Sequence, residues 1–164
     1  MPKPDHNQPI NQASDFGRLA LIVDTREQRP WSFPEEFVEL TRGTLNAGDY
    51  ALDGDGFAIE RKSLADFVGT VVAGWDRFLR ELDRMPLTPA RVIIVEANLS
   101  DLTDREYPQG ANPKFLMSRV AELTLSGVAV IFAGDPTRAA GMAYRIFRHR
   151  QAHLTGARLN GETN

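Results

Sequence analysis

The sequence contains no cysteine among its 164 residues. This absence excludes disulfide bonds and thiolate zinc sites, so any bound metal must be held by oxygen or histidine ligands. No apolar run reaches the length of a membrane-spanning helix, and the first residues, MPKPDHNQPINQASDF, lack the apolar core of a signal peptide. We therefore expect an intracellular protein that has no membrane partner.

An excess of positive charge is also lacking, because the formal net charge is −3. This value argues against a protein that coats nucleic acid through its global charge, but it leaves room for local basic patches. A composition of 42% hydrophobic and 25% charged residues is typical of one globular domain. We predict a flexible leader over residues 1–17, a folded domain over 18–154 and a flexible tail over 155–164.

The segment Gly48–Asp66 carries the strongest local signal. Two apolar runs, Tyr50–Leu52 and Phe57–Ile59, flank two Asp-Gly steps, which favour a β-hairpin. Symmetric pairing places Asp49 opposite Glu60, with Cβ atoms about 5 Å apart. Like charges at that distance repel each other, so we expect a cation between them.

Lys62 adds an ammonium group to this pair, because side chains two residues apart on a strand share a face. Two carboxylates form a hard oxygen site suited to Mg²⁺ or Mn²⁺, which also accept phosphate oxygens as ligands. A lysine beside such an ion can orient the attacking water or help to deprotonate it. The arrangement indicates phosphodiester hydrolysis.

Two motifs resemble those of the XPF-type structure-specific endonucleases, a branch of the PD-(D/E)xK nuclease superfamily. GDY at 48–50 and ERKSLAD at 60–66 look like the GDY…ERKxxxD signature, and VDTRE at 23–27 looks like the VDxRE motif. The two motifs occur in the expected order and cover roughly Leu19–Met85. The resemblance implies an α/β, restriction-endonuclease-like fold in which helices flank a mixed central β-sheet.

The resemblance also implies a divalent metal site held by three carboxylates, those of Asp24, Asp49 and Glu60. The carbonyl of Arg61 is a further candidate ligand. Lys62 would position or activate the attacking water, and Glu27 would support the metal or its waters. Arg26 and Arg61 would orient the carboxylates or meet the phosphate.

Asp66 has a second interpretation that requires no catalysis. It follows Ser63 by three residues, and this is the spacing of a helix-capping box. We therefore interpret Asp66 as a supporting residue and not as a metal ligand. By the same reasoning, Asp53 and Asp55 are turn residues, because their spacing lacks the later ligands of an EF-hand.

Three arginines on a predicted helix are candidates for DNA contact. Their spacing of i, i+3 and i+7 places them on one face, although a solvated mixed-charge face has the same pattern; they are Arg77, Arg80 and Arg84. In the family that this chain resembles, an arginine directly follows the glycine before this helix. Here Trp75 follows Gly74, and Arg77 is the nearest substitute.

The remaining pattern predicts strands and helices in alternation. The expected strands are Leu19–Val23, Thr41–Leu45, Arg91–Val95 and Val128–Ala133. The expected helices are Pro34–Leu40, Pro113–Leu125 and one from Asp135 to about His153, with a loop over Asp101–Asn112. On the last helix, His149 and His153 could share a metal, but no acidic third ligand lies near them, so we predict a basic surface.

The function that these observations favour is a Mg²⁺- or Mn²⁺-dependent DNA endonuclease acting on branched or flapped DNA in repair, recombination or replication. The alternatives are a catalytically inactive nuclease-fold partner module and a restriction-like, sequence-specific nuclease. Members of the family commonly carry further DNA-binding modules for which this chain has no room. DNA is thus the expected partner, together with a second copy of the chain or a separate DNA-binding partner.

Overall fold

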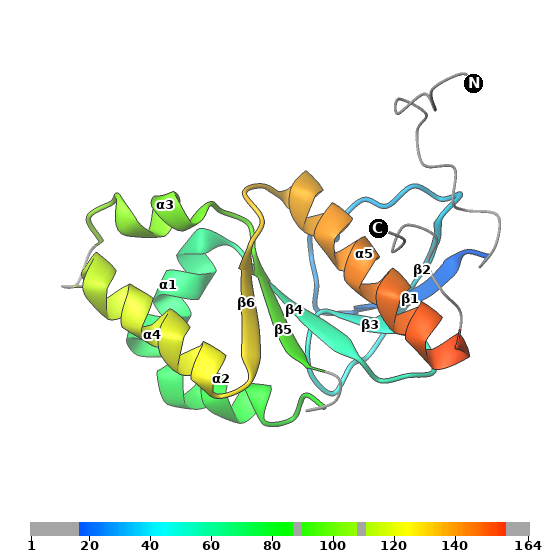
Figure 1. Cartoon of the computed structure of the whole chain (residues 1–164), viewed down its shortest axis with the longest axis horizontal. Coiled ribbons are helices and arrows are strands. Elements are labelled where there is room, and N and C mark those ends of the chain that lie inside the picture. The colour runs from blue at the N-terminus through cyan, green and yellow to red at the C-terminus, as the bar shows by residue number, and fades with distance from the viewer. Residues whose placement is uncertain (1–16, 87–89, 108–110, 157–164) are drawn as a thin grey trace, which may run out of the picture.

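The computed structural model describes residues 17–86, 90–107 and 111–156. Within them one mixed sheet has the strand order β2-β1-β3-β4-β5-β6 (Figure 1). The strands are β1 (Leu19–Asp24), β2 (Val38–Gly43), β3 (Tyr50–Leu52), β4 (Ala58–Lys62), β5 (Arg91–Val95) and β6 (Val128–Phe132). β1 pairs parallel with β2, β3 pairs antiparallel with both β1 and β4, and β4, β5 and β6 are parallel. The predicted α/β fold with a mixed sheet is confirmed.

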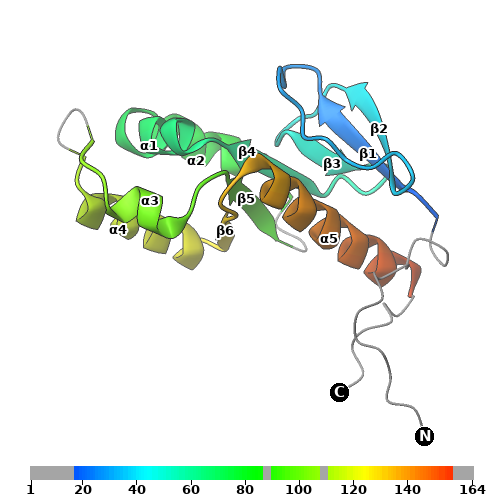
Figure 2. The same ribbon diagram turned by 90° about the horizontal axis from the view of Figure 1, so that it is seen from above.

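Helices cover both faces of this sheet, as predicted. They are α1 (Leu64–Ala73), α2 (Trp75–Leu82), α3 (Leu99–Thr103), α4 (Pro113–Leu125) and α5 (Pro136–Thr155). Buried residues of α5 form one core cluster with β1 and β3, whereas buried residues of the other four helices form a second cluster. Figures 1 and 2 both show α5 standing apart from the group of α1–α4.

Side-chain alternation decides which residues reach which cluster. Tyr50 and Ile59 pack in the α5 cluster, whereas Ala51 and Ala58 pack in the cluster of α1–α4. Because alternate residues of a strand share a face, the charged residues that continue the alanine rows lie on the α1–α2 side. Those residues are Asp49, Glu60 and Lys62.

The predicted hairpin is confirmed in its register. Tyr50 pairs with Ile59 and Ala51 pairs with Ala58, and the Leu52 N–H donates to the Phe57 carbonyl at 3.0 Å. At the turn, both oxygens of Asp55 accept hydrogen bonds from Arg150 of α5, at 2.8 and 2.9 Å. Asp55 therefore anchors the turn to the helix, in keeping with its interpretation as a turn residue.

The helix predicted over Pro34–Leu40 is wrong. Residues 35–37 form a turn, and Val38 begins β2, which pairs with Leu19 of β1. Proline and acids at the start of the segment mimic a helix N-terminus, but pairing with the buried strand β1 outweighs this local preference. The predicted loop over Asp101–Asn112 is also partly wrong, because Asp101 lies within α3 (Leu99–Thr103), where its side chain accepts from the N–H of the N-cap residue Asn98.

The basic surface predicted on α5 is reduced by internal contacts. Arg148 is buried and donates to the Gly17 carbonyl at 2.9 Å, and Arg150 is bound to Asp55. The two histidines of this helix, His149 and His153, are exposed. Nowhere in the described ranges is a helix long and apolar enough to cross a membrane. Residues 1–16 and 157–164 of the predicted leader and tail lie outside the described residues.

Gly48 and Gly54 allow a matched test of the hairpin, because both have φ of +77°. A Cβ on Gly48 would lie 2.9 Å from the Ala58 Cβ and 3.2 Å from the Ile59 carbonyl oxygen, whereas one on Gly54 would meet nothing within 4 Å. We expect Gly54→Ala to cost about 1 kcal/mol of unfolding free energy. Gly48→Ala should cost a further 1–3 kcal/mol or so, since it also overpacks the strand pair. Urea unfolding measures both, and equal losses would contradict the close approach at Gly48.

Candidate active site

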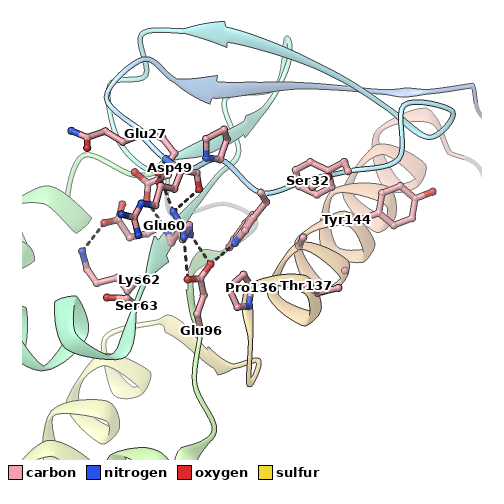
Figure 3. A pocket seen from close by; sticks show the side chains of 18 of the residues that line it. Glu27, Ser32, Asp49, Glu60, Lys62, Ser63, Glu96, Pro136, Thr137 and Tyr144 are labelled. Atoms are coloured by element: carbon pink, nitrogen blue, oxygen red, sulfur yellow. Dashed lines mark hydrogen bonds and ion pairs between the residues drawn. The ribbon is translucent and has the colours of Figure 1, made fainter.

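Asp49 and Glu60 lie opposite each other at the open end of the β3–β4 hairpin, away from its turn. The Asp49 N–H donates to the Ile59 carbonyl at 2.9 Å, and Asp49 Oδ2 accepts from the Arg61 N–H at 2.8 Å. Glu60 Oε1 accepts from Lys62 Nζ at 2.9 Å (Figure 3). The ammonium of Lys62 also lies 5.1 Å from the centre of the Phe78 ring. Lys62 therefore places a positive charge against Glu60 of the carboxylate pair.

The pairing of these carboxylates has an electrostatic cost. Burial, followed by the negative charge of Glu60, raises the pKa of Asp49 to about 7, although the hydrogen bond from the Arg61 N–H opposes the shift. A carboxyl group whose charged form is this unfavourable is stabilised by any cation that binds next to it. The site thus favours a positively charged ligand near neutral pH.

Asp24 is the last residue of β1 and lies on the same sheet face as Asp49 and Glu60, but its carboxylate is hydrogen-bonded to Arg26 and Leu45. Its Oδ1 accepts from the N–H and Nε of Arg26 at 2.8 and 2.6 Å, and its Oδ2 accepts from Arg26 Nη2 and the Leu45 N–H at 3.0 and 2.8 Å. The hydrogen bond from the Arg26 side chain lowers the pKa of Asp24 to about 2. Burial opposes this shift, and the two backbone N–H donors add to it. Asp24 is 1% exposed, whereas the Arg26 side chain is 72% exposed.

A second charge network is centred on Arg61, whose side chain lies on the opposite face of β4 from Glu60 and Lys62. Arg61 donates to both oxygens of Glu96 at 2.7 and 3.1 Å and lies 3.0 Å from Glu27 Oε1. Although burial opposes the shift, the hydrogen bonds to Glu96 and Glu27 raise the pKa of Arg61. Its side chain therefore orients Glu27 and Glu96, and only its backbone contacts Asp49.

Trp31 completes this network and was not singled out from the sequence. Its Nε1–H donates to Glu96 at 2.6 Å, its backbone N–H donates to the Tyr50 hydroxyl at 2.6 Å, and its ring stacks on Tyr50 at 4.4 Å. Glu96 directly follows the buried strand β5, a strand-end position that can be recognised in the sequence. Trp31 gave no such signal, because its partners lie far away in sequence.

Asp66 takes the capping arrangement that its spacing predicts. Its N–H donates to Ser63 Oγ at 3.1 Å, and Ser63 Oγ donates to Asp66 Oδ2 at 2.6 Å. Both residues nevertheless line the same cleft as Asp49 and Glu60. Asp66 therefore supports the start of α1 beside the site.

An open cleft of about 1410 Å³ joins these groups. Its acidic end holds Asp49, Glu60 and Lys62, and Figure 3 shows it continuing past Glu96 toward α5. The far wall is formed by residues of α5 and of the segment before β2, namely Pro136, Thr137, Tyr144 and Ser32. The carboxylate pair is therefore accessible to a large ligand.

Comparison with known proteins agrees with this geometry, since the profile of the ERCC4 domain matches residues 23–146. The chain belongs to the ERCC4 domain family. Its ERCC4 domain superimposes on XPF from Aeropyrum pernix with a TM-score of 0.65 and 26% identity, over 84% of this chain and 67% of that chain. The predicted resemblance to XPF-type nucleases is confirmed.

A curated relative has a different name. A Methanocaldococcus jannaschii protein named for ATP-dependent RNA helicase activity is 26% identical over 134 residues. The match spans 81% of this chain but only 16% of that protein. The chain therefore corresponds to a small part of this relative's length.

The donor set of this ERCC4 domain fits a hard divalent cation in one respect. Within the described residues, Asp49 Oδ1 and Glu60 Oε2 accept no hydrogen bond, and each belongs to a carboxylate that lines the cleft. The same ranges hold no group of three or more acidic or histidine side chains placed to bind one ion. Mg²⁺ commonly takes one or two carboxylates and completes its shell with waters and substrate phosphates.

The three candidate DNA-contact arginines do not line one common groove: Arg77 and Arg80 lie on α2, whereas Arg84 lies beyond its last residue, Leu82. Arg77 lines a groove that begins at Lys62, and Arg84 lines a small pocket that reaches Asp49 and Glu60 from the other side. Arg80 lines neither. Arg77 also lies 3.7 Å from Glu81, an exposed pair of the kind that contributes little stability.

The raised pKa of Asp49 predicts a pH dependence of stability. The folded chain binds the Asp49 proton more tightly than the unfolded chain, whose pKa is about 3.9. Unfolding therefore releases a proton between about pH 4 and pH 7, and the stability falls as the pH rises through this window.

Asp49→Asn removes this titration. Wild type loses stability over this pH range and the variant does not. The difference in unfolding free energy, variant minus wild type, should therefore rise by on the order of 3 kcal/mol from about pH 4 to about pH 8. Urea unfolding at both pH values measures the difference. Parallel pH profiles for the two proteins would show that the Asp49 pKa is not raised.

Proposed function

We propose that this ERCC4 domain is a divalent-metal-dependent DNA endonuclease that hydrolyses phosphodiester bonds in branched or flapped DNA. The observation that carries the proposal is the Asp49–Glu60 pair, with Lys62 at 2.9 Å from Glu60, on an open cleft. Two opposed, partly buried carboxylates are unfavourable when both are charged, and Lys62 is bonded to only one of them, which supports a site for a further cation. Repair, recombination and replication are the processes that supply such DNA.

Asp49 and Glu60 would hold Mg²⁺ or Mn²⁺ through their cleft-facing oxygens, with the Arg61 carbonyl as a further candidate ligand. Asp24 can join them only after Arg26 leaves its carboxylate, because both Asp24 oxygens accept hydrogen bonds in the present arrangement. The exposed Arg26 side chain has the freedom to do so and to meet a phosphate instead. A bound ion would lower the pKa of a coordinated water and offset the charge that develops on the phosphate.

Lys62 would position or activate the attacking water. Its ammonium is held between Glu60 and the Phe78 ring, so it is aimed before substrate binds. Glu27 would support the metal waters from the opposite side, where Arg61 and the Arg29 N–H fix its carboxylate. Asp66 would keep α1 in register with the site.

The first test is cleavage of labelled duplex, single-stranded, flap, fork and four-way-junction DNA with Mg²⁺, Mn²⁺ or EDTA. We expect wild type to cut branched DNA only with metal, and Glu60→Ala to lose at least about a hundredfold in rate. Asp49→Asn should lose activity similarly. Absence of cutting in every metal, with DNA still bound, would overturn the proposal in favour of an inactive partner module.

Lys62→Ala separates positioning of the water from binding of the metal. We expect a loss of about 10²–10⁴-fold in cleavage rate, which is the usual contribution of an acid–base group. Mn²⁺ binding, followed by electron paramagnetic resonance, should persist in Lys62→Ala and disappear in Glu60→Ala. An active Lys62→Ala variant would contradict the assigned role of Lys62.

Whether the ERCC4 domain works alone is a separate part of the proposal. We propose a second copy of the chain or a separate DNA-binding protein as its partner, because branch recognition needs more contact surface than one cleft provides. Light scattering with and without fork DNA distinguishes these possibilities. A monomer that cuts forks at the same rate over a wide concentration range would contradict the need for a partner.

A further inference from the structure

A groove leads away from the carboxylate pair along α1, α2 and α4. Lys62 and Asp66 belong both to this groove and to the active-site cleft, so the two are continuous. The far end of the groove is formed by Trp75, Arg77 and Arg119. Arg119 lies on α4, outside both sequence motifs, and has no role in the proposed function so far.

Arg119 is held in place by aromatic rings. Its guanidinium carbon lies 4.3 Å from the centre of the Trp75 ring and 5.1 Å from that of Phe115. Its Nη1 donates to Glu122 at 2.8 Å, whereas its Nε is buried and has no hydrogen-bond partner among the described residues. Buried N–H groups without an acceptor are rare in native structures, so this group is one acceptor short.

The floor of the groove is open enough for a polymer backbone. Ala65, Gly69 and Ala73 are exposed on α1, and a Cβ added to Gly69 would meet nothing within 4 Å. Small residues of this kind let a backbone approach closely.

The charges of the groove favour an anion along its length. Lys62, Arg77 and Arg119 are cationic, against Asp66 and Asp76. Asp66 accepts a hydrogen bond from the Ser63 hydroxyl and keeps its charge, so the three cations of the lining exceed its two carboxylates by one. The cations lie at the two ends and can meet successive phosphates.

We propose that this groove binds the phosphate backbone of the DNA strand that leads away from the scissile bond, and that Arg119 contacts a phosphate there. The proposal rests on the proposed nuclease function. A guanidinium fixed by stacking loses little freedom when it binds, and its N–H groups match phosphate oxygens in geometry.

The test is the salt dependence of DNA binding, measured by fluorescence anisotropy of labelled fork DNA in EDTA. Arg119→Met keeps the packing between the rings but removes the charge. We expect affinity to fall roughly threefold to tenfold at 0.1 M salt, and the slope of log K against log salt to shrink by about 0.9. Arg119→Lys should restore most of the slope, and Arg145→Met, on the exposed surface of α5, should leave it unchanged.

The absence of cysteine allows an independent test of the groove. Ala65→Cys and Ala121→Cys both replace an exposed helical alanine, but Ala65 lines the groove and Ala121 lies on a different side of α4 from Arg119. Labelling Ala65→Cys with a bulky maleimide should abolish fork binding. Labelling Ala121→Cys should leave it intact.

The outcomes separate the groove from the nuclease. If wild type cuts branched DNA while Arg119→Met keeps wild-type affinity and salt slope, the groove proposal is overturned and the nuclease stands. Unchanged binding by labelled Ala65→Cys has the same meaning. If wild type neither binds nor cuts DNA, both proposals fail.

Discussion

The opposition of Asp49 and Glu60 across the hairpin is the constraint on which the rest of the site depends. Strand register makes the two carboxylates neighbours, and burial makes their charges costly, as the raised pKa of Asp49 records. The surrounding donors offset only part of this cost: the Arg61 N–H serves one acid and the Lys62 ammonium serves the other. The remaining imbalance is what a divalent cation would remove, so the unfavourable pairing and the proposed function are two aspects of the same geometry.

The two faces of the sheet divide the charged residues of the motifs into separate networks. Glu60 and Lys62 point toward α1 and α2, whereas Arg61, between them in sequence, points to the other side and binds Glu96 and Glu27. Because Glu96 also accepts from Trp31, this second network ties the segment before β2 to the end of β5. One face therefore carries Asp49, Glu60 and Lys62, and the other carries the network that positions Glu27 in the same cleft.

Local patterns in the sequence predicted the hairpin, its register and most strands and helices, because each depends on neighbours close in the chain. The capping role of Asp66 was predictable for the same reason. The helix wrongly predicted over Pro34–Leu40 failed because a distant strand, β1, pairs with Val38. The sequence does not predict Trp31 and Arg119 as site residues, because each has a partner that is distant in the chain and comes near only in the folded structure.

The net charge of −3 and the proposed affinity for DNA are compatible because the arginines are divided between internal and external roles. Three arginine side chains donate hydrogen bonds to carboxylates and carbonyls within the domain; they are Arg61, Arg148 and Arg150. This use removes much of the basic character that the sequence of α5 suggests. The two openings on the α1–α2 side are lined by arginines from the loop after β1, from α2 and the residues that follow it, and from α4; they are Arg26, Arg77, Arg84 and Arg119. Electrostatic attraction for a phosphate backbone is therefore concentrated on the α1–α2 side, where Glu60 and Lys62 also point.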